Sequence, residues 1–197
     1  MKKPGLLAFI LVIVFSAQAF SEQAYQNEPN GFRDYKWGYE LSKIKDRLKY
    51  AKTTYTMDDK STATDWYVKE GDILKIGSAN VSSIEYGFWR GKLTEVNIDY
   101  EGDDNFIAVK ETAFGNYGNT EYVNKYYLLK DTGDPILRYV SRYEWGGLIN
   151  HSLKGKPLAR KTKIMLVYDT RSRAGFLSLK SAQADMDRSK AMRGKSR

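Results

Sequence analysis

Four acidic residues near the middle of the chain have a spacing that could bind calcium. Asp99, Glu101, Asp103 and Asp104 would supply the hard oxygen ligands that this ion prefers. The pattern departs from an EF-hand loop, because its sixth position is Asp104 instead of glycine and its twelfth is Lys110 instead of glutamate. A strand end followed by a helix N-terminus, where carboxylates favour the positive end of the dipole, explains the same residues. We therefore expect no metal site here.

The single histidine, His151, is the next residue that could do chemistry. It lies beside Asn150 and Ser152, but no nucleophile elbow or oxyanion loop accompanies it, so a serine-histidine-acid triad is not indicated. Zinc needs more ligands than one imidazole supplies in a chain without cysteine. No pair of carboxylates is distinguished by its spacing. We expect a non-enzymatic protein without a cofactor, with an unrecognised hydrolase as the minority hypothesis.

A basic segment near the C-terminus could bind an anionic partner. The formal charge of +8 is uneven: residues 151–197 carry +10, residues 20–150 carry −4, and Lys2 and Lys3 supply the rest. The segment has Asp169 as its internal acid and consists of Lys154, Lys156, Arg160, Lys161, Lys163, Arg171 and Arg173. If a terminal hairpin forms, Lys161 and Lys163 share a face with Arg171 or Arg173 close by. The alternative is a solvated, solubilising surface.

Trp89 and Arg90 form the remaining candidate contact site. A tryptophan exposed beside an arginine is a common interface anchor, and packing of Trp89 back over the sheet edge is the alternative. Nucleic acid is the ordinary ligand of a basic patch, but an exported protein rarely meets it. We therefore expect a protein partner or an anionic envelope component, such as lipid or an acidic polymer, and no nucleic acid.

The first nineteen residues predict export. Lys2 and Lys3 precede an apolar run over 6–15, and Ala17-Gln18-Ala19 follows as a cleavage site. The run is too short to span a bilayer and no second run follows, so we expect a protein that is not transmembrane after cleavage near Ala19. Its expected location is the periplasm or the exterior. The absence of cysteine excludes disulfides and a lipoprotein anchor.

The stretch from Leu74 to Tyr100 predicts the hairpin that organises the fold. Apolar residues alternate with polar residues in both arms, which is typical of half-buried strands. The apolar positions are all even-numbered, which excludes a simple two-residue loop on Arg90-Gly91. We predict the three-residue loop Trp89-Arg90-Gly91, with Gly91 left-handed.

The remaining patterns predict an α+β fold: an antiparallel sheet of hairpins with two helices packed on one face, in the element order of a duplicated helix-plus-meander unit. The helices are expected over 40–50 and over 103–118, the second with Asp103 as its N-cap and Gly115 or Gly118 at its end. Strands and loops are expected as a hairpin of 65–69 with 73–76, strands over 121–130 and 136–145, a loop over 146–161, and a hairpin of 162–168 with 175–179.

The predicted domain organisation is simple. Residues 1–19 are the signal peptide, 20–31 a flexible lead, 32–180 a single domain, and 181–197 a basic tail that is helical or disordered.

Several motifs carry a resemblance to a protein family. They are Phe32-Arg33 with Lys36-Trp37-Gly38, then Lys75-Ile76-Gly77-Ser78-Ala79 followed by Ile84-Glu85-Tyr86-Gly87-Phe88. With these motifs the chain resembles an uncharacterised family of exported bacterial proteins over most of residues 32–180. The resemblance implies the fold and export, and it implies no activity.

These observations lead to three functional hypotheses. The first is an exported non-enzymatic binding protein that engages a macromolecular partner through a sheet face or loops, with an immunity-like inhibitor as one form. The second is an envelope module that holds anionic lipid or polymer through the basic C-terminal segment. The third is the hydrolase.

Overall fold

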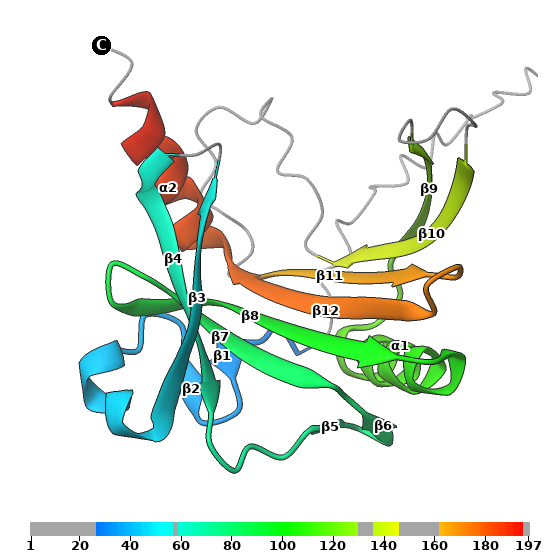
Figure 1. Ribbon diagram of the computed structural model, residues 1–197, viewed down its shortest axis with the longest axis horizontal. Coiled ribbons are helices and arrows are strands. Elements are labelled where there is room, and N and C mark those ends of the chain that lie inside the picture. The colour runs from blue at the N-terminus through cyan, green and yellow to red at the C-terminus, as the bar shows by residue number, and fades with distance from the viewer. Residues whose placement is uncertain (1–26, 57–58, 130–135, 146–161, 195–197) are drawn as a thin grey trace, which may run out of the picture.

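The computed structural model describes residues 27–56, 59–129, 136–145 and 162–194. Within these residues, eight strands form one antiparallel sheet in the order β3-β4-β7-β8-β12-β11-β10-β9 (Figure 1). The strands are β3 Leu48–Thr56, β4 Asp59–Lys69, β7 Ser83–Trp89, β8 Lys92–Glu101, β9 Glu121–Leu129, β10 Ile136–Trp145, β11 Thr162–Asp169 and β12 Ala174–Ser181. The helices are α1 Asp103–Tyr117 and α2 Ala182–Arg193. The predicted α+β class with an antiparallel sheet is confirmed.

The sheet consists of two meanders, β3-β4-β7-β8 and β9-β10-β11-β12, which meet where β8 pairs with β12. Short helical turns, η1 Leu41–Lys43 and η2 Lys45–Arg47, precede the first meander, and α1 precedes the second. This is the element order expected of a duplicated helix-plus-meander unit. Two small hairpins accompany the sheet: β1 Gly31–Phe32 with β2 Tyr35–Lys36, and β5 Lys75–Ile76 with β6 Ala79–Asn80.

The turn of the central hairpin differs from the prediction. Trp89 pairs with Lys92, so the loop contains only Arg90 and Gly91. Both have positive φ angles, 51° and 71°, as in a type I′ turn. The three-residue loop is therefore wrong, whereas the left-handed conformation of Gly91 is confirmed.

A β-bulge at Thr94 explains why the parity of the apolar positions misled the prediction. Phe88 pairs with Leu93, but the next pair is Gly87 with Glu95, which leaves Thr94 as an extra residue in β8. Beyond the bulge the apolar residues of both arms share one face, as predicted. The bulge also directs Thr94 and Glu95 to the same side of the sheet, where one arginine contacts both.

The core lies between α1 and one face of the sheet. Val96 and Ile98 of β8 are fully buried there, and Val109 of α1 is buried against them. Phe106 of α1 stacks on Tyr168 of β11 with 4.3 Å between ring centroids. The helix has Gly102 as its N-cap, one residue before the expected Asp103, and its C-cap is Gly118, one of the two ends predicted.

Two local predictions are wrong. Residues 40–50 form η1, η2 and the start of β3 instead of one helix, because pairing with β4 takes up the chain from Leu48 onward and so short a helix is marginal by itself. Residues 65–69 and 73–76 do not pair with each other. The first segment belongs to β4, which lies between β3 and β7, and the second contains β5, which pairs with β6.

The strands expected over 121–130 and 136–145 form β9 and β10, and the terminal hairpin forms β11 and β12, as predicted. Of the two states expected for the tail, the structure has the helix, α2. The loop over 146–161 and the segment 1–26 lie outside the described residues. In the described ranges, neither helix is long and apolar enough to cross a membrane.

The helices α1 and α2 lie on opposite faces of the sheet. The two helices expected on one face were those over 40–50 and 103–118, of which the second forms α1, whereas α2 arises from the predicted tail. Phe106 of α1 stacks against Tyr100 of β8, and Arg188 of α2 contacts Glu95 of the same strand. Residues an odd number apart in a regular strand face opposite sides. The two strand-to-helix connections differ. Between β8 and α1 the chain turns at Gly102, which has a φ of 87°, whereas β12 continues directly into α2 at Ser181 without a loop.

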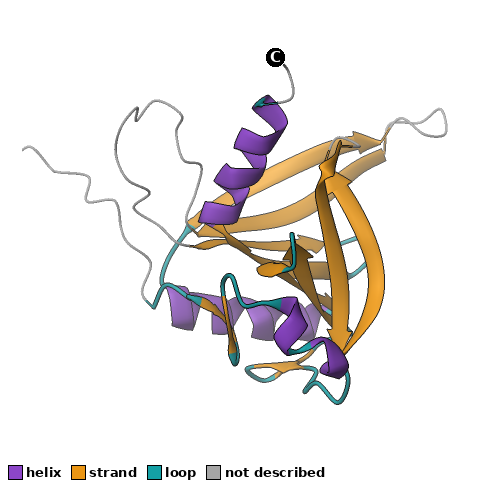
Figure 2. Cartoon of the chain, turned by 90° about the vertical axis from the view of Figure 1, so that its left-hand side faces the viewer, coloured by secondary structure: helices purple, strands orange, loops and turns teal. Residues whose placement is uncertain are grey.

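The sheet is curved toward α2. In Figure 1, β3 and β4 at one end and β9 and β10 at the other bend to the side on which α2 lies, while α1 lies below the central strands. In Figure 2, turned by 90°, α2 again lies above these strands and α1 below them. We call the α2 side, which carries Glu95, Asn97 and Asp99 of β8, the concave face, and the α1 side the convex face.

Candidate functional site

Helix α2 covers one half of the concave face. Its start follows from the sequence, because the Ser181 side chain accepts a hydrogen bond from the Ala184 backbone N–H at 3.3 Å. Asp185 lies in its first turn and Arg193 in its last, as the helix dipole favours. Ala184 is buried against the sheet. The helix therefore has a defined beginning and a small apolar contact.

Ion pairs supply further contacts of α2, and Arg188 also donates to Thr94 Oγ1 at 2.8 Å. Arg188 Nη1 lies 2.7 Å from Glu95 Oε1, and only 9% and 4% of the two side chains are exposed. Lys180 Nζ lies 3.0 Å from the other Glu95 oxygen, and Thr64 Oγ1 donates to Oε1 at 3.2 Å. Nearer the start of the helix, Asp185 pairs with Lys163 of β11 at 2.7 Å. We call Glu95, Lys180, Arg188 and Thr64 the Glu95 cluster.

The charge state of Glu95 follows from these contacts. Burial by itself raises the pKa of the Glu95 carboxyl, but Lys180 and Arg188 outweigh burial, and the pKa lies below its ordinary value. The carboxylate is therefore ionised at neutral pH. It lies in the middle of the sheet, where Gly87 on β7 provides the space, since a Cβ there would approach the Glu95 side chain to 2.7 Å.

Trp89 packs back onto the protein, which was one of the two alternatives considered for it. Only 7% of it is exposed, and its indole N–H donates to the Ser61 carbonyl at 2.9 Å. Guanidinium groups lie over its ring, that of Arg90 at 4.5 Å and that of Arg188 at 5.6 Å from the centroid. Trp89 is thus not an exposed anchor. Arg90 is exposed, at the tip of the hairpin.

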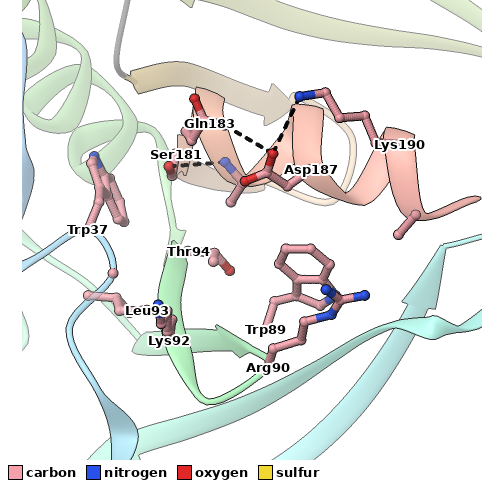
Figure 3. Close-up of a pocket in the computed structure, with 13 residues that line it drawn as sticks. Trp37, Trp89, Arg90, Lys92, Leu93, Thr94, Ser181, Gln183, Asp187 and Lys190 are labelled. Atoms are coloured by element: carbon pink, nitrogen blue, oxygen red, sulfur yellow. Dashed lines mark hydrogen bonds and ion pairs between the residues drawn. The ribbon is translucent and has the colours of Figure 1, made fainter.

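A groove of about 790 Å³ runs between α2 and the tip of the β7–β8 hairpin (Figure 3). Trp37 lies toward one end and Trp89 toward the other, with Thr94 between them and α2 above. We call it the α2 groove. Its charged residues are Arg90, Lys92, Asp187 and Lys190, and its apolar residues include Trp37, Trp89, Leu93, Ala184 and Ala191.

The other half of the concave face contains a shallow depression of about 690 Å³ over β8, β10, β11 and β12. Four larger apolar side chains among its lining residues are partly exposed: Val140, Met165, Val167 and Phe176. Arg142, which forms an ion pair with Glu144, and Asp99 lie at its margin. We call the four apolar residues the apolar strip. No helix or strand within the described ranges lies over it.

The basic segment does not form one patch in the part of it that the structure describes. Lys163 lies opposite Lys180 near one end of the β11–β12 hairpin, whereas Arg171 and Arg173 lie in the turn at the other end. At about 3.3 Å per residue, Lys163 is about 20 Å from the turn. The expected proximity is therefore wrong for these three residues. Lys154, Lys156, Arg160 and Lys161 lie outside the described residues.

The acidic residues near the start of α1 are divided among separate partners. Asp99 accepts hydrogen bonds from Ser83 and Asn97, at 2.7 and 2.8 Å. Asp103 pairs with Arg173 at 2.9 Å and accepts a hydrogen bond from the Tyr168 hydroxyl. Among the described residues, no group of three or more His, Cys, Asp or Glu is placed to hold a metal ion. His151 lies outside the described residues.

Sequence reasoning missed the Glu95 cluster and the apolar strip. Glu95 looked like an ordinary polar-face residue of an alternating strand, and Arg188 like part of a solvated tail. One signal was present: Ala184, Arg188 and Ala191 recur at i, i+4 and i+7, which is the spacing of one helix face. In β11, Val167 and Met165 alternate with fully buried residues, so that both faces of the strand carry apolar side chains.

Comparisons of the chain with protein-family models, with curated proteins and with solved structures found no match. The resemblance noted from its motifs therefore stays a prediction, and functional inference rests on the geometry.

Proposed function

We propose that the protein is an exported, non-enzymatic binding protein that holds a protein partner on the apolar strip of the concave face. The observation that supports this proposal is the strip itself: Val140, Met165, Val167 and Phe176 lie side by side across β10, β11 and β12, and all four are partly exposed. An apolar patch bordered by polar residues is typical of an interaction surface.

The border of the strip suits a protein interface. Arg142 and Glu144 are paired with each other, and Asp99 is held by Ser83 and Asn97. The charges of Arg142 and Glu144 are paired, and Asp99 accepts two hydrogen bonds, so these residues can lie at a polar rim without leaving a buried charge unpaired. An inhibitor that covers a secreted toxin or hydrolase is one form of this function. Export itself is a prediction from residues 1–19.

The test is capture of a partner from an envelope extract at low and at high salt, with the mature chain as bait. The informative variant is M165E/V167E, which places two charges on the strip. The matched control is I73E/I107E, which changes two apolar residues that are 70% and 47% exposed and line neither depression. We expect the wild type and the control to retain one stoichiometric partner at high salt, and the strip variant to lose it at least tenfold.

Equal retention by the strip variant and the control contradicts the proposal. A partner that is lost from the wild type at high salt also contradicts it, because apolar contacts are not screened by salt whereas surface charge contacts are.

A further inference from the structure

We infer that the α2 groove is a second binding site, separate from the apolar strip, and that its ligand is a short acidic peptide segment. The two depressions have no lining residue in common: both reach β8 and β12, but at opposite ends of these strands. The groove brings together Arg90 from the hairpin tip and Lys190 from the C-terminal helix, which are 100 residues apart in the chain.

Arg90 is held in position before any ligand arrives. Its guanidinium lies 4.5 Å from the centroid of the Trp89 ring, and that ring is fixed by its hydrogen bond to Ser61 and by Arg188. Within the described ranges, Arg90 forms no ion pair. A planar guanidinium that stacks on an indole keeps its donor fork free, and this fork matches the geometry of a carboxylate.

Two lysines extend the positive charge along the groove. Lys92 follows the turn and has no ion-pair partner among the described residues; Glu40, opposite it in an isolated bridge, lies 3.4 Å from Lys43. Lys190 has one acidic neighbour, Asp187, at 3.9 Å, and 70% and 43% of the two side chains are exposed. Such a surface pair contributes little. The groove therefore has an excess of positive charge that an anionic ligand would complement.

The shape and the lining of the groove favour a peptide. Leu93 of β8 and Ala184 and Ala191 of α2 give the groove apolar lining, and Trp37 is fixed at one end by its hydrogen bond to Thr162 at 2.7 Å. Its volume lies in the range of about 300–1,000 Å³ usual for ligand sites. Gln183 and Asp187 also line it. Gln183 donates to Asp187 at 3.0 Å. A hydrocarbon chain would offer no partner to the remaining polar atoms of these side chains, which is unfavourable, whereas the amides of a peptide can pair with them.

The test measures the anisotropy of two fluorescein-labelled peptides, one with alternating glutamate and leucine and one with alternating glutamine and leucine, on the mature protein. We expect the acidic peptide to bind at least tenfold more tightly than the neutral one at low salt. We expect R90N and K92Q/K190Q each to weaken its binding at least tenfold. The matched control, K45Q/K49Q, removes two exposed lysines that do not line the groove and should stay within twofold of the wild type.

The choice of R90N separates binding from folding. Arg90 has a φ of 51°, and Asn-Gly is the preferred pair for a type I′ turn, so this variant should unfold at a temperature no lower than the wild type. M165E/V167E should bind the acidic peptide normally, so that failure of the groove and failure of the apolar strip are distinguishable.

Two results would overturn the inference. The first is equal binding of the two peptides, or a loss of affinity for the acidic peptide in K45Q/K49Q as large as in the groove variants. Either result would show non-specific attraction. The second is that the groove substitutions release the protein from vesicles containing phosphatidylglycerol but leave the peptide affinity unchanged, which would make the ligand an anionic lipid.

Discussion

The two halves of the concave face differ in the opposite way from what the burial of apolar surface would predict. The half that carries polar residues, around Glu95, is covered by a helix, and the half that carries the apolar strip has no helix or strand over it in the described chain. Apolar surface is normally buried first, because its removal from water drives folding. Here the helix cover depends largely on ion pairs.

This difference indicates separate roles for the two halves. Buried ion pairs contribute little net stability, since desolvation offsets their attraction, but they require a specific geometry. The Glu95 cluster therefore specifies where α2 lies and, with it, the shape of the α2 groove. The apolar strip, which would stabilise a cover by its hydrophobic contact, is left available for a partner.

The largest expected effect is on the covered half. The substitution R188A removes the closest partner of Glu95 and leaves a buried carboxylate with Lys180 and the Thr64 hydroxyl. Breaking a buried pair in this way should lower the free energy of unfolding by about 3 kcal/mol, measured by urea denaturation. The double variant E95L/R188L is the control, because removal of both charges should be much less destabilising than the single change. A loss in R188A no larger than in the double variant would show that α2 does not depend on this pair.

The next effect is a dependence of stability on pH that belongs to the same half. The pKa of Glu95 is lower in the folded protein than its ordinary value of 4.5. A lowered pKa contributes stability that is present above pH 4.5 and is lost as the pH falls through the folded pKa. We therefore expect the wild type to lose stability below pH 4.5 more steeply than E95Q, measured as urea midpoints between pH 6 and pH 3. Parallel curves would contradict the assignment of Glu95 as the titrating group.

The smallest effect is expected on the uncovered half, where we predict that a substitution hardly changes the free energy of unfolding. The substitution V167T changes a partly exposed residue of the apolar strip and should alter the free energy of unfolding by about 0.5 kcal/mol or less. Its neighbour Leu166 faces the core and is fully buried, so L166A should reduce stability by about 3 kcal/mol. If V167T were as destabilising as L166A, the strip would be part of the core and unavailable to a partner.

Local patterns predicted a large part of the fold. The alternation in β7 and β8 identified the central hairpin and its buried face, the terminal hairpin of β11 and β12 was also predicted, and the glycine at the end of α1 was among the predicted stops. The failures have local causes. The apolar residues of the two arms have the same parity, but a bulge at Thr94 interrupts the ladder, so that a two-residue loop still leaves them on one face. The segment 40–50 has helical spacing, but pairing with β4 outweighs that preference.

The candidate sites were much less predictable than the fold. Trp89 and Arg90 were singled out for an exposed anchor, but their structural role is that of a buried indole that positions an arginine. Lys163 and Arg173 were expected near one another and lie at opposite ends of a hairpin. Neither Glu95 nor Arg188 was distinguished, because the two residues are far apart in the chain and each looks ordinary among its neighbours.

The sequence by itself determined the elements whose cause is local: the alternation of the strands, the left-handed glycine in the central turn, and the cap at Ser181 where α2 begins. Only the tertiary structure decided which face each helix covers, that Glu95 is a buried anion, and that Arg90 and Lys190 line one groove. The physical reason is how far apart along the chain the interacting residues lie. Periodicity, turns and caps depend on neighbours within a few residues, whereas ion pairs and grooves depend on which distant segments the sheet brings together.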